Sequence, residues 1–335
     1  MKSRISMFVS VAALAALTFF VPSRVYAQQN WKAALGGQSS DMGRQAVAFL
    51  PNELWIHEGD SITWTSGSGD IHTVSFFIAG QAFEDFTVGC PGFSPSGASF
   101  DGTKCVSAPP LVEGQSFTVS FPKPGNFSLI CLVHTHMTGV IHVLAASATL
   151  PHDQAFYDAQ AAEQRRSLLT DTDKQRDMDD MLSAHLLANK NSVTAGIGEM
   201  TVTGAGFESL SVVRFLKGTI EVHKGDTIEW VNLDPALPHT ITFGKEPANP
   251  EPPSGNVPIT PDADGVLHAT ISSQGDNVHS GLIVASPQNQ VGVAQSPPGN
   301  TRFRITFTEA GTYNYICALH DNLGMIGKVI VRSNW

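Results

Sequence analysis

The segment Phe303–Cys317 reads FRITFTEAGTYNYIC, and the segment Phe117–Cys131 reads FTVSFPKPGNFSLIC. Each begins with five residues in which large apolar side chains alternate with polar ones, the period of a strand that buries one face. A glycine-containing turn follows, and a second strand-like run then ends at a cysteine. The same unit of strand, turn, strand and cysteine therefore occurs twice in the chain.

Further matched segments show that more than one hairpin is duplicated. HEGDSITW at His57–Trp64 returns as HKGDTIEW at His223–Trp230, and HTVSF at His72–Phe76 returns as HTITF at His239–Phe243. The segments keep the same order in both copies, which indicates a tandem repeat of one domain. Short alternating strands punctuated by Gly and Pro predict an all-β sandwich or barrel for each copy.

The repeat also divides the 335-residue chain. We expect a first domain at residues 28–148 and a second at residues 194–335. Residues 149–193 differ in composition, being rich in Ala, Gln, Asp, Arg and Leu, and are predicted to form a helical connector. Residues 244–300 are crowded with Pro, Gly, Ser, Asn and Gln, which favours a long loop inside the second domain.

Residues 1–27 are predicted to be a secretory signal peptide. Two basic residues precede a nearly unbroken apolar run at residues 5–21, and Val25-Tyr26-Ala27 offers a small-residue cleavage pattern. The run is short for a membrane span of about 20 residues, so an uncleaved anchor is the weaker alternative. Cleavage after Ala27 would make the protein periplasmic or secreted, where thiols pair, bind metal or become oxidised. We expect no transmembrane segment after this cleavage.

The charge balance bears on the possible partners. The chain has 20 Lys plus Arg against 30 Asp plus Glu, a net charge of −10. A cleaved leader would take Lys2, Arg4 and Arg24 with it, so the mature chain would carry −13. The sequence shows no basic patch that would neutralise phosphates, which argues against nucleic acid as a partner.

The second copy ends in a set of residues suited to a metal. Cys317 is followed by His320 and Met325 in a C-x2-H-x4-M pattern, and His239 lies upstream at the start of a matched segment. A thiolate, two imidazoles and a thioether form the donor set of an electron-transfer copper site, because soft sulfur stabilises Cu(I) and imidazole suits Cu(II). One loop would supply three ligands while His239 arrives from a neighbouring strand.

The first copy carries the same donors with a shorter loop. Cys131 is followed by His134 and Met137, and His72 lies upstream. Two residues separate His134 from Met137, whereas four residues separate the second His and Met. We predict His72, Cys131, His134 and Met137 as the ligands of a second copper ion. The role of His136 is left open. The alternatives are a competing ligand, a gate for electron transfer to a partner, and no role.

With these two motifs, the chain resembles the cupredoxin family. The second motif looks like that of plastocyanins, and the shorter first motif is similar to that of amicyanin. The resemblance covers most of the chain outside the leader and the connector. It implies two Greek-key β-sandwich domains, each holding a type 1 (blue) copper ion for one-electron transfer. The chain departs from the small carriers in having two domains, a connector and long insertions.

Cys90 and Cys105 remain to be explained. They flank a stretch rich in Gly, Ser and Pro that occurs only in the first copy. In an oxidising compartment a disulfide that closes this loop is the default expectation. A third metal site is the alternative, although no His lies between the two cysteines.

Two other function classes compete with electron transfer. The chain resembles nitrite reductases and multicopper oxidases in its domain duplication, but those enzymes have a His next to the blue-copper Cys. Here the neighbours of the two cysteines are Ile130, Leu132, Ile316 and Ala318, so we expect no catalytic copper centre. The third class is a copper-binding or storage protein, for which a rigid mixed-ligand site is poorly suited compared with Met- or Cys-rich tracts. We expect an electron carrier that meets a redox partner with a basic docking patch.

Overall fold

The computed structural model describes residues 27–81, 90–134, 136–170, 178–179, 181–183, 191–285 and 298–333. The predicted signal peptide lies outside these residues apart from Ala27, so its cleavage stays a prediction. Among the described residues, no helix has the length and apolar character needed to cross a membrane.

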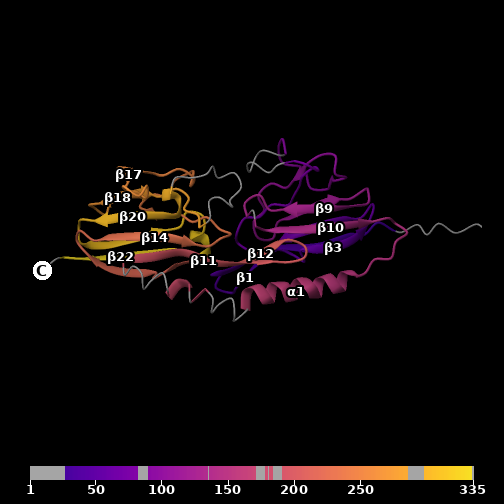
Figure 1. Ribbon diagram of the computed structural model, residues 1–335, viewed down its shortest axis with the longest axis horizontal. Helices are drawn as coiled ribbons and strands as arrows, with labels where there is room; N and C mark the ends of the chain where they lie inside the picture. The colour runs from indigo at the N-terminus through magenta and orange to yellow at the C-terminus, as the bar shows by residue number, and fades with distance from the viewer. Residues whose placement is uncertain are drawn as a thin grey trace, which may run out of the picture.

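Each copy of the repeat forms a β-sandwich of two sheets, and one sheet is shared between the copies (Figure 1). The shared eleven-stranded sheet has the spatial order β17 (Ile259–Pro261), β18 (Leu267–Ile271), β20 (Arg302–Phe307), β14 (Thr227–Leu233), β11 (Ser192–Val202), β12 (Phe207–Leu216), β2 (Arg44–Leu50), β1 (Asn30–Gln38), β4 (Ser61–Ser66), β8 (Ser116–Ser120) and β6 (Ala98–Ser99). The prediction of an all-β protein is confirmed.

A separate sheet completes each sandwich. In the first domain it has the order β3 (Glu53–His57), β10 (Thr138–Leu144), β9 (Gly125–Ile130), β5 (Ser75–Phe76) and β7 (Val106–Ser107). In the second domain it has the order β13 (Thr219–His223), β22 (Ile326–Arg332), β21 (Gly311–Ile316), β15 (Thr242–Phe243), β19 (Val278–His279) and β16 (Ser254–Gly255).

The two halves of the shared sheet repeat each other. β1 pairs antiparallel with β2 and parallel with β4, and β11 pairs antiparallel with β12 and parallel with β14. The halves join where β2 and β12 pair antiparallel, with Ala46 opposite Leu210. An antiparallel pairing of equivalent strands relates the domains by a local twofold rotation. Elements of the first domain near this boundary therefore lie across from the corresponding elements of the second domain.

The alternating segments build the core between the sheets. Phe117 and Phe303, on β8 and β20, are fully buried, as are Trp64 and Trp230 on the strands beside them. Burying one such aromatic side chain contributes about 1.5–3 kcal/mol relative to leaving it exposed. The period of two that predicts these strands also places every second side chain in the core.

The predicted connector begins with helix α1 (Gln154–Thr170), which packs on the first domain (Figure 1). The Tyr157 hydroxyl accepts the Trp55 backbone N–H at 2.9 Å. Leu168 joins a buried cluster with Ala46 and Leu50 of β2. The helix thus covers the part of the shared sheet next to the domain boundary.

The prediction of a long loop at residues 244–300 is only partly right. Its described part contains β16, β17, β18 and β19. β18 pairs parallel with β20, and its Ala269 and Ile271 are buried. Apolar residues at every second position give this stretch a strand period that its polar composition concealed. Residues 286–297 lie outside the described part of the chain.

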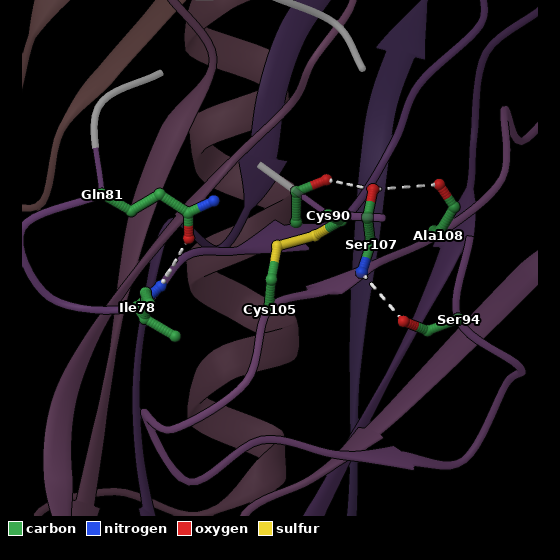
Figure 2. Close-up of a disulfide and its surroundings, with 8 residues drawn as sticks. Ile78, Gln81, Cys90, Ser94, Cys105, Ser107 and Ala108 are labelled. Carbon is green, nitrogen blue, oxygen red and sulfur yellow. Dashed lines mark hydrogen bonds between the residues drawn. A yellow bond between two sulfur atoms is a disulfide. The ribbon is translucent and has the colours of Figure 1, made fainter. Parts of the chain in front are cut away.

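The predicted disulfide joins Cys90 to Cys105, with their Cα atoms 5.3 Å apart (Figure 2). Within the closed loop, the Ser94 hydroxyl accepts a hydrogen bond from the Ser107 backbone N–H, which lies just beyond the loop, at 3.2 Å. A cross-link over about 15 residues contributes about 3 kcal/mol when it is counted as lost chain entropy. The two cysteines of the predicted copper sites are both free and buried.

Candidate metal centres

The second predicted site gathers its ligands from two segments of one domain. His239 precedes β15 and is fixed by its backbone N–H, which donates to the Ile283 carbonyl at 3.0 Å. Cys317 follows β21, and His320 lies on the loop between β21 and β22. The Cys317 Sγ lies 3.9 Å from His239 Nδ1 and 3.5 Å from His320 Nδ1, and the two Nδ1 atoms are 3.2 Å apart.

Backbone hydrogen bonds close the ligand loop of this site. The Cys317 N–H donates to the Met325 carbonyl at 3.0 Å, and the Met325 N–H donates to the His320 carbonyl at 3.0 Å. The four-residue spacing contains the short 3₁₀ helix η3 (Asp321–Leu323). Met325 is fully buried with Cys317 in the domain core.

The first predicted site repeats this geometry. The Cys131 Sγ lies 3.8 Å from His134 Nδ1, and His134 Nδ1 lies 3.2 Å from His72 Nδ1. The Cys131 N–H donates to the Met137 carbonyl at 3.0 Å, and the Met137 N–H donates to the His134 carbonyl at 2.8 Å. In this domain the backbone hydrogen bond from Met137 to His134 closes the shorter loop.

Both sulfur atoms lie where a thiolate is favoured. The Thr73 backbone N–H donates to Cys131 Sγ, and the Thr240 backbone N–H donates to Cys317 Sγ, each at 3.3 Å. Burial opposes ionisation of both thiols, but the neighbouring imidazoles outweigh it and hold the pKa values of Cys131 and Cys317 well below the ordinary range. The hydroxyls of the same two threonines also fix the loops. Each accepts a hydrogen bond of 2.7 Å from the backbone N–H of the residue after the cysteine.

These arrangements fit the copper donor set on their chemistry. In each domain two imidazole Nδ1 atoms and one thiol sulfur lie within 4.8 Å of one another, and all three residues are buried. Burial disfavours a charged ring, yet nearby carboxylate and thiolate groups raise the pKa values of His134 and His239 to about 9. The surroundings of each sulfur therefore favour positive charge, which suits a bound cation. Soft sulfur with imidazole nitrogen selects copper or zinc over hard cations.

Two glycines, which the sequence analysis did not single out, shape the wall behind the upstream histidines. Gly36 and Gly196 sit at irregularities of β1 and β11, with φ of 65° and 77°. A Cβ at Gly36 would overlap the His72 ring, and a Cβ at Gly196 would overlap the His239 ring. Only glycine combines this left-handed backbone with so close an approach. Glycine inside an otherwise strand-like segment was the available signal.

The outer nitrogens of the upstream histidines have different neighbours in the two domains. His72 Nε2 lies 2.9 Å from the Ser68 hydroxyl. His239 Nε2 lies 3.8 Å from Asp234 Oδ2, and the other Asp234 oxygen accepts the Ser211 hydroxyl and two backbone N–H groups. Such partners orient a ligand imidazole and tune the metal that it holds.

The loop histidines of both domains share one neighbour, which the sequence analysis also missed. The Asp70 carboxylate lies 3.3 Å from His134 Nε2 through one oxygen and 3.9 Å from His320 Nε2 through the other. Burial opposes its ionisation, but the charges of His134, His320 and His72 outweigh this and lower the pKa of Asp70. The two sites therefore face each other across the domain boundary.

His136, whose role was left open, lies outside both ligand triads. Its ring is 6.0 Å from the ring of Phe207, on β12 of the second domain. Nearby, the Thr138 hydroxyl accepts the Phe207 backbone N–H at 2.9 Å. The side chain thus faces the domain boundary.

Comparison with known proteins gives the class. Residues 202–332, which contain all four predicted ligands of the second site, match the family described as copper binding proteins, plastocyanin/azurin family. Plastocyanin of Sambucus nigra is 34% identical over 86 residues, 26% of this chain and 85% of the relative. Plastocyanin of Synechococcus sp. (strain JA-2-3B'a(2-13)) is 28% identical over 116 residues, 34% of this chain, so the chain spans 61% of that relative's length. The crystal structure of amicyanin from Paracoccus versutus aligns with a TM-score of 0.24 and 16% identity, covering 37% of this chain and 86% of that one.

The chain belongs to the plastocyanin/azurin family of copper-binding proteins, the cupredoxins. Its structure carries two candidate His-Cys-His sites, one in each sandwich.

Proposed function

We propose that the protein is an exported blue copper protein that transfers single electrons through two mononuclear type 1 copper sites. The observation that carries the proposal is the repetition of one donor geometry, with each Nδ1 pair 3.2 Å apart beside a buried thiol sulfur. The predicted ligands are His72, Cys131, His134 and Met137 in the first domain and His239, Cys317, His320 and Met325 in the second.

Bound copper would supply a reversible one-electron couple between Cu(I) and Cu(II). The chain's own residues hold the donors in place in both states. The ligand loops are closed by backbone hydrogen bonds to Met137 and Met325, and each thiol accepts a backbone N–H. Donors fixed by a packed core would rearrange little between oxidation states, as electron transfer requires.

Electron transfer is favoured over catalysis by the residues beside the cysteines. In neither copy is the residue next to the Cys a His that would lead to a second copper centre. Turnover of nitrite or oxygen by the copper-loaded protein would instead support the enzyme alternative.

Export and partner choice are part of the same proposal. The leader pattern at residues 1–27 supports a periplasmic or secreted location. A mature charge of −13 favours a redox partner with a basic docking patch, met through a small and short-lived contact.

The two sites are expected to titrate with separate midpoint potentials. The His-to-Met spacing differs, and the second site has the Asp234 carboxylate where the first has the Ser68 hydroxyl. An additional buried acid favours the more positive oxidised metal, so the second site should have the lower midpoint. Redox titration of Cys131→Ser and Cys317→Ser variants, each keeping one copper, measures the two values. Midpoints that coincide would show that these differences do not tune the sites.

A further inference from the structure

We propose that the Asp70 carboxylate connects the two sites electronically, so that an electron moves between them within one chain. This inference rests on the proposed function, because both sites must hold redox-active copper. The evidence is the position of one acid between two ligand imidazoles from different domains.

The geometry gives a short route with few gaps. His134 and His320 each turn Nδ1 towards their own site, and the opposite nitrogen, Nε2, towards Asp70. One carboxylate therefore spans the space between the two rings, with gaps of 3.3 and 3.9 Å. Electronic coupling falls steeply across non-bonded gaps, so two close contacts through a small planar group carry it well.

The route is also buried. His134, His320 and Asp70 are 1%, 3% and 6% exposed. The imidazole edges that leave the two sites are thus turned inward towards each other. This arrangement suits exchange between the sites better than independent contact of both with outside partners.

Asp70 has no acidic counterpart in the second copy of the repeat. Aligning the upstream histidines places Asp70 opposite Leu237, since each lies two residues before its histidine. Every predicted ligand has a counterpart in the other copy, but this acid does not. A buried acid is costly without partners, so its place at the boundary needs a reason that belongs to the two-domain molecule.

Hydrogen bonds at the domain boundary fix the second ligand loop and the Asp70 carboxylate. The Arg214 guanidinium donates to the Leu323 carbonyl of the second ligand loop at 2.7 Å and to the Asp41 carbonyl of the first domain at 2.6 Å. The Ile71 N–H donates to Asp70 Oδ1 at 2.7 Å and fixes the carboxylate. The pairing of β2 with β12 fixes the domains behind these contacts.

The proposed step conserves charge and atoms. The reduced site loses one electron, the oxidised site gains it, no bond breaks, and Asp70 stays a carboxylate. A site that has been reduced by an external donor could then pass its electron to the other site, without a second encounter between the protein and a donor.

The test injects less than one electron per chain into fully oxidised, copper-loaded protein by flash photolysis of a soluble photoreductant. The blue absorbance of each site is followed, with the single-site variants Cys131→Ser and Cys317→Ser as spectral references. We expect a redistribution phase whose rate is independent of protein concentration, and a several-fold slower phase in Asp70→Ala, which removes the group between the two rings. If the native spectra overlap, Met325→Gln would replace the predicted thioether ligand of the second site with an amide and shift the spectrum of that site.

The control is Asp41→Asn, whose carboxylate lies at the same boundary but accepts from Ser39 and Gly43. It should leave the redistribution rate unchanged. Two coppers with normal spectra but no concentration-independent phase would overturn the inference while leaving the proposed function intact. A redistribution rate in Asp70→Ala equal to that of the wild-type protein would also overturn it. Failure of the wild-type protein to hold two redox-active coppers would count against the proposed function instead.

Discussion

Copper-loaded Cys317→Ser protein is expected to hold one copper ion per chain and to keep about half of the visible thiolate-to-copper absorbance. Serine has no thiolate to offer, so the second site loses the ligand that generates the colour. The first site takes all of its predicted ligands from its own domain, so it should survive. Metal analysis with an absorption spectrum measures both quantities.

Two further variants test whether the loss of copper is specific to the site that is changed. Cys131→Ser should give the mirror outcome, because Cys131 has the same contacts in the first domain. A Cys90→Ser, Cys105→Ser double variant removes the disulfide and should keep both coppers, at a stability cost of about 3 kcal/mol. Loss of both sites on changing Cys317 alone would mean that the sites are not separate mononuclear centres.

Gly196→Ala is expected to abolish the second site while sparing the first. The new Cβ would overlap the His239 ring, and alanine would also be strained at a φ of 77°. Overpacking of a buried position costs about 1–3 kcal/mol, and here the movable neighbour is a predicted ligand. Copper content should fall to one ion per chain, and thermal unfolding should shift to lower temperature.

Gly225→Ala is the matched control for this change. Gly225 has a similar backbone conformation, with a φ of 89°, but a Cβ there would meet nothing within 4 Å. It should lose some stability through backbone strain and keep both coppers. Normal copper content in Gly196→Ala would show that the close approach to His239 is not needed for the site.

The sequence was informative wherever the signal is local or repeated. Alternating residues such as Phe303, Ile305 and Phe307 report a strand with one buried face, and the structure buries all three. The Cys-His-Met spacing predicts that the three side chains converge on one point, because these residues share one loop that follows a strand. The upstream histidines were found because the repeat marks them twice.

The remaining features depend on how distant segments meet. Asp70 is an ordinary loop acid until the pairing of β2 with β12 brings the second ligand loop against it. Asp234 likewise becomes notable only beside the His239 ring. The strand β18 does show a strand period, but the Pro-, Gly- and polar-rich segment around it indicated a loop, and its pairing with β20 identifies it as part of the sheet. Contacts between domains leave no period or spacing that a single sequence displays.

The most direct measurement is the metal content and visible spectrum of the mature protein purified from the compartment in which it matures. The account predicts two copper ions per chain and a strong visible band that disappears on reduction and returns on oxidation. Zinc in both sites, or copper without such a band, would contradict the claim that the protein transfers electrons through two blue copper centres.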